Sequence, residues 1–240
     1  MRRNIQFVLP HGYDSEEEAD AFRQKGFMVG PVPLESADML IFHGAPIWSR
    51  EAYPDDPRYV NTWEKCIMMR RLSNYYPLIA DLCIPTFFAP ELNEDVEREI
   101  RRRNWRKAFV KNDIKSLEAV GQGLSVWPDT PFDTMTGLFA KYYPPTGMFA
   151  VRKYIEPQLI DMQEDRYWIV NNRIHYRHTD IPEVVREAVR RLAHIGNMYY
   201  TIDATPEMIT EINAGEGADR YGVNPPELFA SWFAEEFLDN

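Results

Sequence analysis

Two short apolar segments near the end of the sequence finish in acidic or amide side chains. The first segment ends at Asp203, and the second ends with Glu211 and Asn213 on either side of Ile212. Residues two apart in a β-strand point to the same face, so Glu211 and Asn213 project together and Ile212 points away from them. If the two segments pair as neighbouring strands, Asp203 joins the same face. The chain is therefore expected to form a sheet with oxygen-bearing side chains at one end of one face.

Two carboxylates and an amide oxygen form a hard ligand set of the kind that Mg²⁺ prefers, with water and phosphate oxygens completing its octahedron. The alternative is an ordinary strand end whose polar side chains meet solvent. The spacing of Asp203, Glu211 and Asn213 does not by itself decide between the two.

The first ~90 residues have the alternating pattern of a parallel sheet covered by helices. Apolar strands are expected at Ile5–Leu9 and Asp38–Gly44, separated by a helix that ends near Gly26. Ser15 is the expected N-cap of that helix, with Glu18 in the capping-box position. We expect residues 1–90 to form an α/β lobe.

Residues 91–240 have a different, α+β character. The turn Asn171-Asn172 predicts a tight hairpin between strands at Arg166–Val170 and Arg173–Arg177. A further helix is expected near Val60–Leu72, before this region. Within residues 91–240, helices are expected near Asn93–Arg103, Pro182–His194 and Pro225–Leu238. Strands are expected at Trp105–Val110, Met148–Ile155, Tyr199–Asp203 and Met208–Asn213.

Cationic side chains follow two of these strands. Lys111 comes directly after an apolar run, Lys115 follows four residues later, and Arg152-Lys153 lies within another apolar segment. Lysines at the end of a buried strand are placed to contact phosphate oxygens, and the glycine loop at residues 121–123 allows close approach of backbone to a phosphate. Taken alone, each of these lysines, the arginine and the glycine loop is also compatible with a solvent-exposed surface that binds no ligand.

The order of these features resembles the ATP-grasp superfamily over roughly residues 100–240, and the segments Phe109–Ser116 and Val151–Tyr154 look like its R2K clade. The resemblance implies an ATP-grasp fold with ATP and Mg²⁺ as cofactors. It implies that nucleotide contacts come from Lys111, Lys115, Arg152, Lys153, Tyr154, Ile155, Glu156 and Glu164. Glu156 or Glu164 would hold the ribose, and the sequence does not decide which.

The same resemblance assigns Asp203, Glu211 and Asn213 to the metal, and Arg177 to the transferring phosphoryl group, with Arg166 as a second catalytic arginine. The implied reaction is carboxylate–amine ligation of small-molecule or peptide substrates through an acyl phosphate. A nucleotide-binding regulatory or immunity-associated module without ligase activity is an alternative. So is a phosphotransferase on the same scaffold.

The substrate side is less constrained by the sequence. His43 and Gly44 follow an expected parallel strand, where ligands bind in such sheets, and are substrate candidates. His175 and His178 flank Arg177 and are candidates for the acceptor site.

Composition excludes several other classes of protein. A net charge of -10, from 27 Lys+Arg against 37 Asp+Glu, argues against an extended nucleic-acid interface. No apolar run is long enough for a membrane span. Cys66 and Cys83 do not form a disulfide framework or a zinc pattern, so we expect a cytoplasmic protein.

Overall fold

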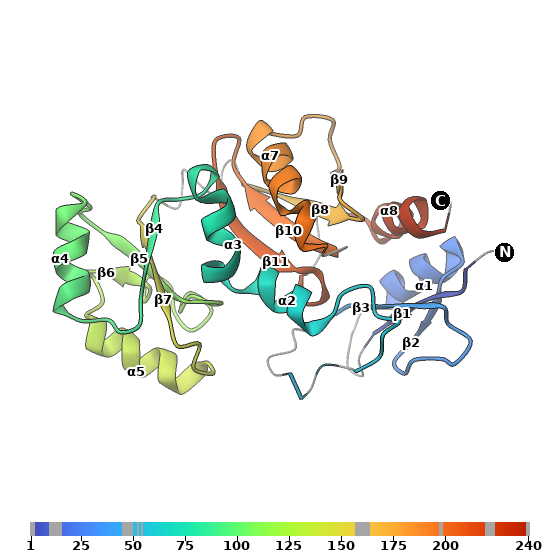
Figure 1. Cartoon of the computed structure of the whole chain (residues 1–240), viewed down its shortest axis with the longest axis horizontal. Coiled ribbons are helices and arrows are strands. Elements are labelled where there is room, and N and C mark those ends of the chain that lie inside the picture. Colours follow the sequence, from blue (N-terminus) through green and yellow to red (C-terminus); the bar gives the residue numbers. More distant parts are fainter. Residues whose placement is uncertain are drawn as a thin grey trace.

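The computed structural model describes residues 3–9, 16–44, 50–51, 53, 55–156, 164–196, 199–218 and 224–238. The described chain forms three sheets, each at the centre of one lobe, and the lobes lie in a row (Figure 1). We call them the first, second and third lobe in the order of their strands. The second lobe lies at the left of Figure 1, the third in the middle and the first at the right.

The first lobe contains a parallel sheet with the strand order β2-β1-β3. Its strands are β1 (Ile5–Val8), β2 (Met28–Gly30) and β3 (Met39–Phe42), and α1 (Glu16–Lys25) connects β1 to β2. All four residues of β1 are buried. The predicted parallel, helix-covered lobe is confirmed, whereas the predicted N-cap Ser15 lies outside the described residues.

The last helix, α8 (Pro226–Phe237), packs beside α1 and completes the core of the first lobe. The ring of Phe7 on β1 stacks on Phe22 of α1, with centroids 3.7 Å apart, and meets Phe233 of α8 edge-on at 5.0 Å. Segments from opposite ends of the described chain therefore share one apolar core.

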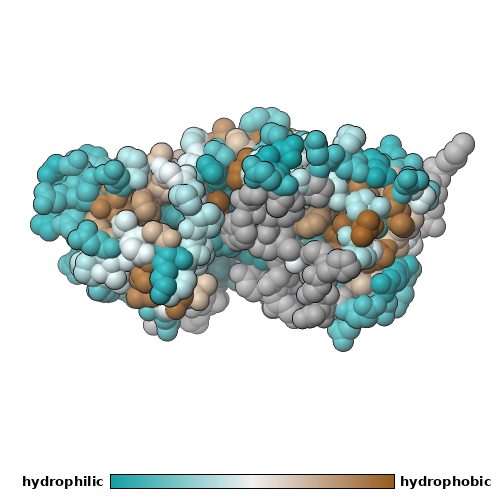
Figure 2. All heavy atoms as spheres, turned by 90° about the horizontal axis from the view of Figure 1, so that it is seen from below, coloured by the Kyte–Doolittle hydropathy of each residue, from teal (hydrophilic) through white to brown (hydrophobic). Residues whose placement is uncertain are grey.

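The second lobe is an antiparallel sheet with the order β4-β7-β5-β6. Its elements are β4 (Thr86–Ala89), α4 (Glu94–Arg102), β5 (Ala108–Asn112), β6 (Val126–Trp127), α5 (Phe132–Tyr142) and β7 (Phe149–Lys153). Asn93 caps α4 by accepting hydrogen bonds from the amides of Asp95 and Val96. The surface over α4 is almost entirely hydrophilic (Figure 2), as expected for a solvated helix face.

The third lobe is an antiparallel sheet with the order β11-β10-β8-β9. Its strands are β8 (Asp165–Val170), β9 (Arg173–His175), β10 (Tyr199–Ala204) and β11 (Ile209–Ala214), followed by the short helix η3 (Gly215–Gly217). Helices α2 (Trp63–Arg70), α3 (Leu72–Ile79) and α7 (Glu183–Leu192), with the short turns η1 (Ala80–Leu82) and η2 (Ala193–Ile195), pack on one face.

The hairpin between β8 and β9 turns at Asn171 and Asn172, as the sequence predicts. Both residues have positive φ, 50° and 63°, which a two-residue turn of this type requires. The strand pair β10 and β11 also forms as expected.

The sequence patterns did not predict β2, α3, β4, β6 and α5. Pro77 lies inside α3, and this residue made the region resemble a loop. In α5 the buried residues Phe132, Met135 and Phe139 follow helical spacing. Helices α2 and α3 precede residue 90 but pack on the third lobe, and β4 belongs to the sheet of the second lobe.

Candidate active site

A cavity of about 490 Å³ lies between the second lobe and the third lobe. Its walls come from four parts of the chain: the approach to β4, the segment from β5 to β6, the end of β7 with the residues after it, and the strands of the third lobe. The lining residues are Ile84, Phe109, Lys111, Ser116, Glu118, Gln122, Gly123, Val126, Arg152, Lys153, Tyr154, Ile155, Glu164, Asp203, Thr210 and Glu211.

The predicted metal-binding side chains come together at the third lobe's side of this cavity. Asp203 on β10 lies directly opposite Glu211 on β11 in the antiparallel register. The amide Nδ2 of Asn213 donates to Asp203 Oδ2 at 3.4 Å and to Glu211 Oε2 at 3.2 Å. The two carboxylates and the amide therefore form one continuous polar cluster on one face of the sheet.

Each of the two carboxylates contacts a cation. The buried ammonium of Lys111, at the end of β5, donates to Glu211 Oε1 across the gap between the lobes. Arg166 on β8 binds Asp203 with both arms of its guanidinium, from Nε at 2.7 Å and from Nη2 at 2.6 Å. Such a bidentate pair is short and directional.

The acidity of these groups follows from burial and the neighbouring charges. Burial alone would raise the pKa of Glu211, but the charges of Lys111 and Lys115 and hydrogen bonds from Lys111 and Asn213 outweigh it and lower the pKa to about 2. Burial raises the pKa of Asp203, and the Arg166 guanidinium opposes this shift. Glu211 is therefore ionised throughout the physiological range.

The opposite wall carries the residues predicted to contact the nucleotide. Lys153, Tyr154 and Ile155 line the cavity at the end of β7. Arg152 also lines it; the guanidinium Nε is buried and has no hydrogen-bond partner within the described part of the chain. A buried cationic donor of this kind needs an acceptor, which an anionic ligand in the cavity would provide.

The two glutamates left open as ribose ligands lie in different positions. Glu164 lines the cavity and accepts a hydrogen bond from Thr210 Oγ1, and burial raises the pKa of this carboxyl. Glu156 follows β7 and is exposed, and it is not part of the lining within the described residues.

Lys115 is not among the lining residues of the cavity, although its neighbour Ser116 is. The turn that carries this residue is held by Asn112, whose side-chain oxygen accepts from the Lys115 amide at 2.6 Å. Its charge helps to lower the pKa of Glu211, which places it within electrostatic reach of the cluster.

The glycine loop folds around a carboxylate. Glu118 accepts hydrogen bonds from the amide of Gly123 at 3.0 Å and from the amide of Ser125 at 3.4 Å. Gly123 has a φ of 79°, a left-handed conformation that favours glycine. The loop thus presents backbone N–H groups to an anion, and in this structure the anion is a side chain of the protein.

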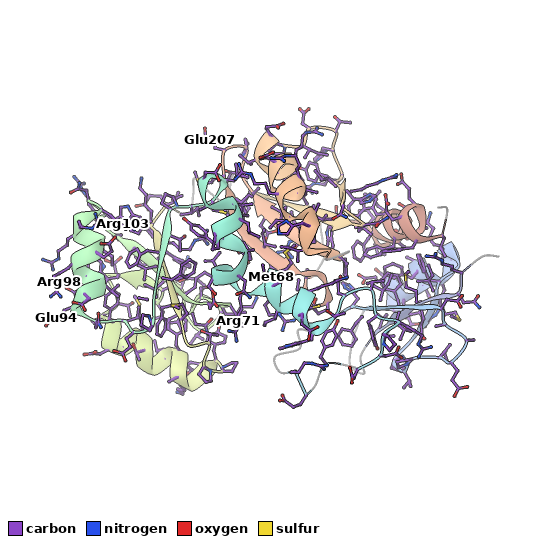
Figure 3. The ribbon with its side chains drawn as sticks, viewed as in Figure 1. Met68, Arg71, Glu94, Arg98, Arg103 and Glu207 are labelled. Atoms are coloured by element: carbon purple, nitrogen blue, oxygen red, sulfur yellow. The ribbon has the colours of Figure 1, made fainter. Side chains whose placement is uncertain are left out.

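Arg71 is a residue that the sequence analysis did not single out. It links α2 to α3 (Figure 3), and the amide of the next residue, Leu72, donates to the carbonyl of Asp113 at 2.9 Å. The backbone at Arg71 therefore lies near the end of β5. Its Nε is buried without a hydrogen-bond partner in the described chain. Its only signal in the sequence is an arginine pair at 70–71, which is common on helices.

The predicted substrate residues lie away from this cavity. His43 is 1% exposed; its Nε2 lies 2.9 Å from Glu18 Oε1 and its Nδ1 lies 2.5 Å from the hydroxyl of Tyr199. The amide of Gly44 donates to the carbonyl of Glu216 at 3.0 Å. Within the described residues, both positions join the first lobe to the third rather than lining the cavity.

The other predicted side chains beyond the hairpin are also outside the lining. Arg177 forms an ion pair with Asp165 at 3.0 Å. Asp165 is the residue before Arg166 in β8. His175 lies against Glu236 of α8 at 3.3 Å, and His178 packs edge-on to a tyrosine ring. Neighbouring residues of a strand point to opposite faces, so Asp165 directs Arg177 away from the face that carries Asp203.

The residues present fit Mg²⁺ by the chemistry of their donor atoms. Asp203, Glu211 and Asn213 offer oxygen ligands on one face, and the same cavity is lined by Arg152, whose buried Nε has no hydrogen-bond partner among the described residues. Among the described residues there is no group of three or more His, Cys, Asp or Glu side chains that could hold a metal ion by itself. A metal at this position would therefore need ligands from another molecule, which Mg²⁺ commonly takes from substrate phosphates.

Both cysteines are buried and form no disulfide. Burial raises the pKa of the Cys66 thiol well above its ordinary value and that of Cys83 to about 12. Neither is poised as a nucleophile.

Comparison with known proteins identifies the fold. No family profile matches the sequence, and no curated protein sequence matches it. The structure is similar to D-cycloserine synthetase DcsG, with a TM-score of 0.67 and 14% identity over 98% of this chain and 100% of that one. It is also similar to the macrocyclase MdnC bound with precursor peptide MdnA from Microcystis aeruginosa MRC, with a TM-score of 0.63, 14% identity, and coverage of 98% and 100%.

A third similar structure is the ATP-grasp ligase PsnB complexed with minimal precursor, Mg and ADP, with a TM-score of 0.59, 11% identity, and coverage of 97% of each chain. The chain therefore has the ATP-grasp fold, as its motifs predict. At these identities the likeness establishes the fold and leaves the reaction to be argued from the site. No helix within the described residues has the length and apolar character needed to cross a membrane.

Proposed function

We propose that this chain is an ATP- and Mg²⁺-dependent carboxylate–amine ligase of the amino-acid or peptide type, acting through an acyl phosphate. The observation that carries the proposal is the convergence, in one cavity, of cations from the second lobe with the oxygen cluster of the third lobe. Lys111 and Glu211 meet there although they are 100 residues apart in the sequence. Phosphoryl transfer depends on such charge neutralisation and alignment more than on a protein nucleophile.

The nucleotide contacts are proposed as follows. The backbone of Lys153, Tyr154 and Ile155 would bind the adenine edge, and Glu164, which lines the cavity, would hold the ribose hydroxyls. The phosphate groups would lie among the cations of the site. Those cations are Lys111 and Arg152, which line the cavity, and Lys115, whose charge acts on Glu211. Assignment to the R2K clade is part of this proposal.

At the phosphate end, Asp203, Glu211 and Asn213 would hold the metal. A bound Mg²⁺ would neutralise phosphate charge and orient the phosphates for in-line attack by the substrate carboxylate. Arg166, on the adjacent strand, would steady the transferring phosphoryl group once the nucleotide and metal occupy the site. Arg177 remains a prediction from the sequence.

The substrate class is proposed from chemistry and from structural likeness. Ligation needs a carboxylate that accepts the phosphoryl group and an amine that displaces phosphate. MdnC was solved with a precursor peptide and PsnB with a minimal precursor. We infer that the carboxylate substrate is a peptide or an amino acid. We also propose that the enzyme acts in the cytoplasm.

The proposal is tested by incubating the protein with ATP, Mg²⁺ and a panel of amino acids, polyamines and short peptides. ADP release that requires a particular acid and amine, with a new amide of matching mass, is the expected result. Absence of thermal stabilisation by saturating ATP–Mg²⁺ would refute it, since a ligand at 100-fold its Kd adds about 2.7 kcal/mol.

One observation favours a nucleotide-binding module without ligase activity. Glu118 already occupies the amides of the glycine loop that would otherwise meet a phosphate. This alternative predicts nucleotide binding with no amide product. A phosphotransferase would instead give a stable phosphorylated acceptor without stoichiometric release of inorganic phosphate.

A further inference from the structure

The carboxylates of the proposed metal site are all engaged by the protein's own cations. Lys111 forms an ion pair with Glu211, and Arg166 forms a bidentate ion pair with Asp203. Asn213 donates its amide to both carboxylates. The carboxylate oxygens that would coordinate a metal therefore already accept hydrogen bonds within the protein.

A divalent cation and the Lys111 ammonium compete for the carboxylate of Glu211. Mg²⁺ requires oxygen ligands at about 2.0–2.1 Å in near-ideal octahedral geometry. An ammonium in direct contact with Glu211 blocks one of those ligands, and its charge repels the metal in a cavity where Lys111 is 7% exposed and screening is weak. While Lys111 contacts Glu211, the metal site is incomplete.

A nucleotide supplies the missing partner. Lys111 lines the same cavity as the glycine loop and Arg152, where the triphosphate is proposed to bind. Phosphate oxygens are acceptors for the ammonium, so a bound nucleotide offers Lys111 an alternative to Glu211. It also provides the additional oxygen ligands that a metal would need.

We propose that the nucleotide assembles the metal site: its phosphates take over Lys111, which releases Glu211 for Mg²⁺. The inference rests on the proposed ATP- and Mg²⁺-dependent function and gives Lys111 a second role, as the group that closes the metal site in the free protein. Because binding linkage is reciprocal, metal must also tighten nucleotide binding by the same factor.

The test uses Mn²⁺ as a paramagnetic probe of the metal site in the full chain, with free Mn²⁺ measured by electron paramagnetic resonance. The wild-type protein is expected to bind Mn²⁺ at least about tenfold more tightly with a non-hydrolysable ATP analogue than without it, allowing for Mn²⁺ bound by the analogue alone. This comparison needs no substitution.

Two matched variants separate the contact from the charge. Lys111→Met and Lys115→Met each remove one positive charge, but of these two lysines Lys111 is the one that donates a hydrogen bond to Glu211. Lys111→Met is expected to bind Mn²⁺ without nucleotide at least about tenfold more tightly than wild type, while its affinity for the analogue falls. Lys115→Met is expected to stay within about threefold of wild type for Mn²⁺ alone.

Adding Glu211→Gln to Lys111→Met is expected to abolish the gained affinity for Mn²⁺, which places the ion at Glu211. The inference is overturned if the wild-type protein binds Mn²⁺ equally well with and without the analogue, an outcome that leaves the ligase proposal standing. It is also overturned if both lysine variants gain affinity equally. Failure of Mn²⁺ to bind under every condition would refute both this inference and the proposed function.

Discussion

Replacing Gly215 with alanine tests how tightly the short helix η3 packs on β10 in the third lobe. A Cβ at Gly215 would lie 2.5 Å from ring atoms of Tyr199, far inside the ~3.5–4.0 Å of a relaxed carbon–carbon contact. The ring cannot move freely, because Tyr199 is 1% exposed and stacks on Trp168 with centroids 5.7 Å apart. Its hydroxyl is also held 2.5 Å from Nδ1 of His43.

Overpacking of this kind costs about 1–3 kcal/mol, and the constraints on the ring place Gly215→Ala in the upper half of that range, about 2–3 kcal/mol. For a chain of this size the melting temperature should fall by about 4–12 °C. The assay is urea unfolding followed by circular dichroism, together with a thermal scan.

Gly137 provides the matched control. It lies inside α5, and a Cβ built there meets no atom within 4 Å. Gly137→Ala should therefore stabilise the protein by about 0.5–1 kcal/mol through the helix preference of alanine. If Gly215→Ala unfolds within about 0.5 kcal/mol of wild type while Gly137→Ala gains stability, the packing argument at Tyr199 is refuted.

Three further predictions concern single side chains. Glu211→Gln should lower ligase turnover by about 10³-fold in steady-state kinetics, with a smaller change in ATP affinity; wild-type turnover at limiting Mg²⁺ would show that the metal is misplaced. Burial lowers the pKa of His175 despite the nearby Glu236, so the contribution of this residue to folding stability is intact above about pH 6.5 and decreases as the pH falls below it. His175→Gln should therefore reduce the dependence of the unfolding free energy on pH below about 6.5, measured by urea unfolding across pH. Asp113→Ala removes the acceptor for Ser73 N and Oγ, at 2.7 and 2.6 Å, at the start of α3 and should cost about 1–2 kcal/mol in the same unfolding assay; an unchanged midpoint would contradict this capping role.

The parts of the fold that the sequence predicts well are those with local signals. The hairpin at Asn171 and Asn172 needs only two residues that tolerate positive φ. The pairing of β10 and β11 follows from two adjacent apolar runs, and the cluster of Asp203, Glu211 and Asn213 follows from the period of a strand.

What the sequence does not reveal are relations between distant segments. The contact of Lys111 with Glu211 depends on how two lobes approach each other, and no local pattern encodes that distance. The position of Arg71 depends on the carbonyl of Asp113 binding the start of α3. His43 follows an apolar strand as a ligand-binding residue would, but the third lobe covers it, and its partners Glu18 and Tyr199 come from other elements.

The packing of α8 against α1 has a consequence for the way the chain is made. Phe229 and Phe233, the partners of Phe7 and Phe22, are synthesised roughly 200 residues after them. At about 5–20 residues per second, a ribosome needs roughly 10–40 s to cover that interval. Until α8 emerges, the aromatic ring faces of the first lobe that α8 covers in the folded protein stay open to solvent.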